Sequence, residues 1–135
     1  MKRREERELA FAIGFERSIT GEPVAAVIDG AEDVREIVIP PFSVSLATGV
    51  EENESVIDED IARNIRGWTL SRLSKVALSI LRLAIYEMRY ESGIPVSVSI
   101  NEAVELAKVY GDTEDAPFVN GVLSTIAKEL PADHA

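Results

Sequence analysis

Apolar residues recur at helical spacing along most of this chain. The spacing predicts helices over residues 3–17, 23–31, 43–53, 54–65, 69–90, 99–110 and 113–130. The one strand-like run lies within residues 37–43, and Pro40-Pro41 ends it after four positions. The pattern therefore indicates an all-α protein of about seven helices, without repeats or a long linker.

The longest helical signal covers residues 69–90 and is apolar on nearly every side, which is typical of a central, buried helix. It also carries two charged residues, Arg82 and Glu87. Because a buried charge needs a partner, we expect these residues to form an ion pair that locks two helices together. The acidic start of the next helix offers Glu102 or Glu105 as partners, and contact with a ligand is the alternative role.

The sequence predicts that the next helix opens with a capping box, Ser99-Ile100-Asn101-Glu102. A hydroxyl and a carboxylate three residues apart each satisfy a backbone N–H at the start of a helix. Asn101, Glu102 and Glu105 together also resemble a carboxylate metal site. The capping box already accounts for Glu102, and no second Glu-x-x-His motif is present, so we expect no metal.

The last helix contains a contradiction, because Asn120-Gly121 is a strong turn signal inside an uninterrupted apolar stripe. With Thr113 or Asp115 as the cap, Pro117 falls in or near the first turn, where proline is tolerated. Glycine inside a helix costs about 1 kcal/mol relative to alanine. We expect this cost to be offset by a close-packed neighbouring helix, with Asn120 bonded to its backbone. A helix broken at this dipeptide is the alternative.

Composition limits the chemistry available. A chain of 135 residues is one domain by length, and its hydrophobic fraction of 46% is that of a globular protein. It has no cysteine, which is consistent with a cytoplasmic location, and no membrane-length apolar run. The only histidine, His134, lies in the C-terminal tail, and no catalytic motif or phosphate-binding loop is present. We therefore expect no catalytic residue, no cofactor and no membrane association.

The net charge of −10 disfavours nucleic-acid binding overall, so that any contact with phosphates would have to be local. The one basic cluster is at the N-terminus, where cations and carboxylates alternate: Lys2, Arg3, Arg4, Glu5, Glu6, Arg7 and Glu8. Arg3, Arg4 and Arg7 share one helical face by their i, i+3 and i, i+4 spacing. This face could hold phosphates, and an ordinary salt-bridged helix start is the alternative.

Three segments in the C-terminal half resemble the NusB family of transcription antitermination factors. They are "ILRLAIYEM" (80–88), "IPVSVSINEAVELAKVYG" (94–111) and "FVNGVLSTIAKEL" (118–130). The first helix, "RREERELAFAIGF", is similar to the family's arginine-rich first helix, although more loosely. The order and spacing of the three C-terminal segments make their combination specific.

The resemblance implies one NusB-like domain of two small helical bundles, residues 1–66 and 67–135, with no enzymatic activity. It also implies binding of the boxA element of nascent ribosomal RNA transcripts together with NusE, a ribosomal protein, within an antitermination complex of RNA polymerase. Some members of the family are homodimers. A NusB-like protein-interaction module that lacks RNA binding is the second hypothesis.

Carried over residue by residue, the resemblance places RNA contacts on three groups of residues. The basic group at the first helix is Lys2, Arg3, Arg4 and Arg7, the aromatic group is Phe15, Tyr110 and Phe118, and the acidic member is Glu114. We expect the arginine-bearing helix to lie beside Phe118. Glu5 and Glu6 depart from the family, where Arg, Lys or Ala is usual, and fewer cations mean a weaker electrostatic contribution.

Overall fold

The computed structural model describes residues 1–67 and 69–130; His134 lies outside this range. The described residues form seven α-helices and one short 3₁₀ helix, with no strand among them, as the pattern predicted. In chain order these are α1 (Arg3–Thr20), α2 (Val24–Arg35), α3 (Pro41–Glu52), α4 (Glu54–Arg63), η1 (Leu70–Arg72), α5 (Lys75–Tyr90), α6 (Val96–Tyr110) and α7 (Asp115–Ala127).

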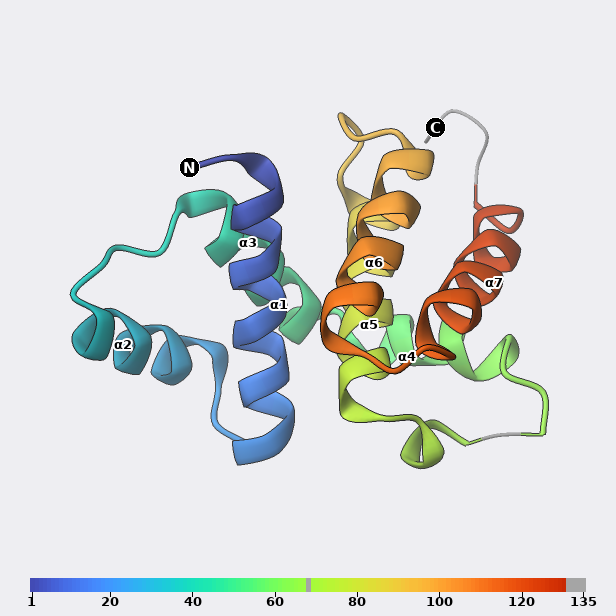
Figure 1. Ribbon diagram of the computed structural model, residues 1–135, viewed down its shortest axis with the longest axis horizontal. Coiled ribbons are helices and arrows are strands. Elements are labelled where there is room, and N and C mark those ends of the chain that lie inside the picture. Colours follow the sequence, from blue (N-terminus) through green and yellow to red (C-terminus); the bar gives the residue numbers. More distant parts are fainter. Residues whose placement is uncertain (68, 131–135) are drawn as a thin grey trace.

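Helix α5 is the centre of the structure. It packs against α1, α3, α4, α6 and α7, while α1, α2 and α3 form the other side of the molecule (Figure 1). Every residue from Val76 to Arg89 is buried or half-buried, which agrees with the central helix predicted within residues 69–90. The α-helix begins only at Lys75, where the Ser74 hydroxyl accepts a hydrogen bond from the Ala77 backbone N–H at 3.0 Å. Residues 70–72 form η1 instead.

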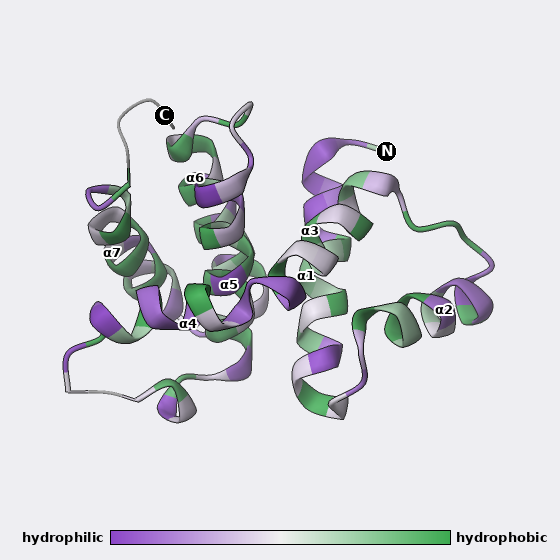
Figure 2. Ribbon diagram, turned by 180° about the vertical axis from the view of Figure 1, so that it is seen from behind, coloured by the Kyte–Doolittle hydropathy of each residue, from purple (hydrophilic) through white to green (hydrophobic). Residues whose placement is uncertain are grey.

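Two apolar cores hold the helices together. The larger core joins α1 and α3 to α4, α5, α6 and α7, so that it crosses the division predicted at residue 66. The smaller core lies between α1, α2 and α3. Helix α4, expected in the N-terminal part, packs mainly against α5 and also touches α7. Hydrophilic residues gather at the start of α1 (Figure 2).

Two helices begin earlier than the pattern predicted. Residues 37–40 form no strand, and α3 begins at Pro41, whose missing N–H is not needed in a first turn. The capping box predicted at Ser99 is wrong, because α6 begins three residues earlier, at Val96. Ser99 lies inside the helix and is buried, and its hydroxyl donates to Glu87 rather than capping the helix.

Helix α7 continues unbroken through Asn120-Gly121, as predicted, and Pro117 lies in its first turn. The reason that we expected for the glycine is wrong: a Cβ built on Gly121 meets no atom within 4 Å, and Asn120 is exposed. Close approach occurs instead at Gly49 of α3, where a Cβ would overlap the ring of Tyr86 on α5.

Among the described residues, no helix is both long and apolar enough to span a membrane.

Replacing Gly121 with alanine should stabilise the protein, because the exposed mid-helix position has room for a methyl group. The expected gain is about 0.5–1 kcal/mol, which corresponds to a rise of roughly 2–5 °C in the thermal midpoint. Gly49→Ala is the matched comparison and should lower the midpoint, since the Tyr86 ring would have to move. A lower midpoint for Gly121→Ala would show that the position is constrained in a way that the helix does not reveal.

Candidate nucleic-acid interface

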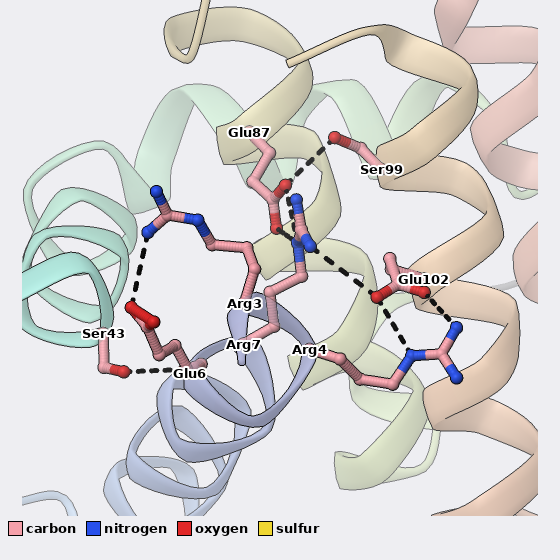
Figure 3. A network of polar contacts seen from close by, with 8 residues as sticks. All are labelled: Arg3, Arg4, Glu6, Arg7, Ser43, Glu87, Ser99 and Glu102. Carbon is pink, nitrogen blue, oxygen red and sulfur yellow. Dashed lines mark hydrogen bonds and ion pairs between the residues drawn. The ribbon is translucent and has the colours of Figure 1, made fainter. Parts of the chain in front are cut away.

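Arg7 is not on the surface. It lies one helical turn before Ala10 and Phe11, on the face of α1 that enters the larger core, and is 5% exposed. Its Nε donates to both carboxylate oxygens of Glu87 on α5, at 3.0 and 2.9 Å (Figure 3). The Ser99 hydroxyl donates to the same carboxylate at 3.1 Å. The Arg7 guanidinium is therefore paired inside the protein, and the RNA contact predicted for it is wrong in this arrangement.

Arg4 is exposed, but it is paired. Its Nε and Nη2 donate to the two carboxylate oxygens of Glu102 on α6, at 3.2 and 2.8 Å. The same carboxylate lies 3.6 Å from Nη1 of Arg7, so that Glu102 faces two arginines of α1. The hydrogen bond from Arg4 lowers the pKa of Glu102 below its usual value, against the opposing effect of partial burial.

Arg3 is the arginine of this cluster with the weakest acidic contact, a single 3.3 Å pair with Glu6 on its own helix. Its guanidinium lies over the ring of Phe42 on α3, 3.9 Å from the ring centroid, in cation–π geometry. Lys2 is exposed next to it, and its backbone N–H donates to the Glu5 carboxylate at 3.0 Å. Glu5 and Glu6, which depart from the family pattern, thus stabilise the start of the helix and the position of Arg3.

The ion pairs predicted for α5 exist, but their partners differ from those expected. Arg82 pairs with Asp58 at 2.9 Å and with Glu54 at 3.2 Å, both on α4. Glu87 pairs with Arg7 of α1 rather than with Arg82. The expectation that each charge locks two helices is confirmed, and the expectation that the carboxylates Glu102 or Glu105 supply the partner is wrong.

Two aromatic residues of the predicted interface line one apolar hollow. Phe15 of α1 and Tyr110 at the end of α6 form its walls with Phe11, Ile19 and Val76. The Tyr110 hydroxyl donates to Glu8 at 2.6 Å, and this hydrogen bond raises the pKa of Tyr110. Sequence reasoning did not identify the role of Glu8.

Phe118 lines a second hollow, at the starts of α5 and α7, together with Glu114 and Arg72. The Lys75 ammonium donates to the Ser18 carbonyl at 3.0 Å, which places the start of α5 at the end of α1. The pair between Arg7 and Glu87 joins the opposite ends of these helices. Phe118 is therefore at the far end of α1 from the arginines, and the expectation that they lie side by side is wrong.

The geometry is that of a long surface rather than a compact site. Exposed cations lie at the start of α1. One aromatic hollow lies along the second half of this helix, and the other lies near its end, about 27 Å from its start for a helix of 18 residues. Between them runs the seam of α1 and α6, lined by Glu8, Glu102 and Glu105. Such a surface can contact an extended polymer at separate points.

Comparison with known proteins agrees with this architecture. The NusB family model matches residues 4–128. The transcription antitermination protein NusB of Bacillus thuringiensis (strain Al Hakam) is 47% identical over 96% of this chain and its own full length. T. maritima NusB is 36% identical, with a TM-score of 0.87 over 99% of this chain and 96% of its own.

A chain in the crystal structure of a plectonemic RNA supercoil is 26% identical and superposes with a TM-score of 0.86, over 96% of both chains.

Breaking the buried pair should unfold the protein more readily. Arg7→Gln leaves Glu87 charged and buried, and we expect a loss of about 3–5 kcal/mol in the free energy of unfolding. Arg4→Gln is the matched control and should cost much less, since the Arg4 side chain is exposed to solvent. Urea denaturation measures both. Equal losses would contradict the assignment of Arg7 to the core.

Stability should also fall in acid, between about pH 5 and pH 3. Burial raises the pKa of Asp60, but hydrogen bonds from Arg89 and Arg63 outweigh this effect and lower the pKa. Burial likewise raises the pKa of Glu54, and a hydrogen bond from Arg17 helps to lower it below the usual value. A lowered pKa stabilises the fold above the unfolded value of about 4 and loses this contribution as the pH falls through the folded value. Urea midpoints measured across this range test the expectation, which a flat profile would contradict.

Taken together, the family model over residues 4–128, the near-full-length relatives and the seven-helix architecture show that this chain belongs to the NusB family.

Proposed function

We propose that this protein is a transcription antitermination factor that binds boxA-type RNA of nascent ribosomal RNA transcripts together with NusE. The observation that carries the proposal is the 47% identity, over nearly the whole chain, to proteins named for transcription antitermination. The related chain found in a crystal structure of RNA supports the choice of nucleic acid. The protein acts in the cytoplasm, without catalysis, as part of an RNA polymerase antitermination complex.

The described surface supports an extended single strand better than a compact ligand. Lys2, Arg3 and Arg4 provide phosphate contacts at the start of α1. Phe15 and Tyr110 provide rings farther along this helix, and Phe118 provides a ring near its end. Unpaired bases stack on aromatic rings with roughly 1–3 kcal/mol each. Aromatic contacts therefore compensate for the small number of available cations.

A second function is favoured by one observation, the engagement of the arginines by carboxylates. With Arg7 buried and Arg4 paired, a protein-interaction module with weak RNA binding also fits the structure. Its partner would be NusE or a second copy of the chain. RNA binding that is measurable only with NusE present supports the first function. Absence of RNA binding under every condition supports the second function.

Reversing Lys2 and Arg3 to glutamate should weaken binding of a boxA-type RNA at low salt. Both side chains are exposed, and Arg3 loses only its contacts with Glu6 and the Phe42 ring, so that the fold should survive, unlike after reversal of Arg7. If both contact phosphates, the slope of log K against log salt should fall by about 1.4, since single strands contribute about 0.7 per contact. Titrations between about 50 and 200 mM salt, with and without NusE, measure it.

The matched control is reversal of Arg35 and Lys128, which are exposed on α2 and after α7. It makes the same change in net charge away from the start of α1 and should lower the affinity much less. A second control is an RNA of equal length and scrambled sequence. Equal effects of the two double reversals would exclude a contact at the start of α1.

A further inference from the structure

Arg3 and Arg4 are neighbours in sequence, and both are exposed, yet they differ in what holds them. The side chain of Arg3 is 58% exposed and touches Glu6 through one nitrogen. The side chain of Arg4 is 69% exposed, but Nε and Nη2 form a two-point pair with Glu102 (Figure 3). The guanidinium edge that Arg4 presents to Glu102 is an edge that would recognise a phosphate.

Glu102 is the more buried partner of this pair. The Glu102 side chain is only 14% exposed, and one of its oxygens also lies 3.6 Å from Arg7. Arg7 is in turn held by Glu87, so that a connected set of charges reaches from the core to the surface. The carboxylate is therefore held between two arginines of α1, and a ligand of Arg4 has to compete with it.

We propose that Glu102 is an autoinhibitory counter-ion, which occupies Arg4 and competes with RNA phosphate for it. The inference rests on the proposed function, and it identifies a residue that sets RNA affinity without touching RNA. A phosphate must displace the carboxylate, or share Arg4 with it against the repulsion of two negative charges. Arg3, whose one acidic partner lies on the same helix, is available without this competition.

Glutamine at position 102 keeps the size of the side chain and an acceptor oxygen, and removes the charge. Glu102→Gln should tighten binding of a boxA-type single-stranded RNA by about three- to tenfold near 0.1 M salt, since one cation is released. The slope of log K against log salt should steepen by about 0.7. A purely structural role of Glu102 would not increase the salt dependence.

The decisive measurement is a double-mutant cycle with Arg4→Gln. If the gain acts through Arg4, removing Arg4 should weaken RNA binding by a larger factor in the Glu102→Gln protein than in the unaltered protein. The doubly substituted protein should lose the gain. A gain that persists without Arg4, or an unchanged affinity of Glu102→Gln, would overturn the proposal.

Glu59→Gln is the matched charge control, because Glu59 is exposed on α4, a helix that packs mainly against α5. It should change the affinity less than Glu102→Gln. Thermal midpoints establish that each variant is folded. If Glu102→Gln does not fold, Glu102→Asp serves instead, since its shorter side chain withdraws the carboxylate from Arg4 and should give a smaller gain; no gain would again overturn the proposal.

The outcomes separate this inference from the function on which it rests. If reversal of Lys2 and Arg3 weakens RNA binding while Glu102→Gln has no effect, the RNA-binding function is supported and the proposed role of Glu102 is wrong. If no variant binds RNA, with or without NusE, both are overturned.

Discussion

The structure depends on one buried ion pair, between Arg7 of α1 and Glu87 of α5. It joins the helix that opens the chain to the central helix, and its two side chains are 6% and 2% exposed. A pair taken out of water this completely contributes less to net stability than to orientation, because desolvation offsets much of the attraction. What the pair determines is the position of α1 relative to α5 and α6. The exposed cations and the seam between α1 and α6 follow from that position.

The same pair explains why a cluster of basic residues makes only a small basic surface. Of the four cations in the first seven residues, Arg7 serves the core and Arg4 serves the contact with α6. Lys2 and Arg3 remain as the cations not engaged by another helix's carboxylate at this end of α1. For a chain with a net charge of −10, the number of available cations affects nucleic-acid binding more than the number present.

The elements could be predicted from the sequence because apolar periodicity reports local structure directly. All seven helices were predicted, and the errors concern their ends and contacts. The capping motif at Ser99 misplaces the start of α6, because the three residues before it are already helical. The burial of Arg7 had a signal, since it lies three and four residues before Ala10 and Phe11, on one face of the helix. The usual exposure of arginine outweighs this signal in a prediction from sequence.

Pairings across the fold had no such signal. Ninety-eight residues separate Arg4 from Glu102, and 80 separate Arg7 from Glu87. Several carboxylates were equally suitable partners on charge alone, and only the packing of α1 against α5 and α6 selects among them. Helical periodicity gives the face on which a residue lies, but not which residue of another helix it meets. The availability of a cation to a ligand is therefore a tertiary property, and the glutamate of an "INEAVELAK" segment takes its effect on Arg4 from the fold rather than from its motif.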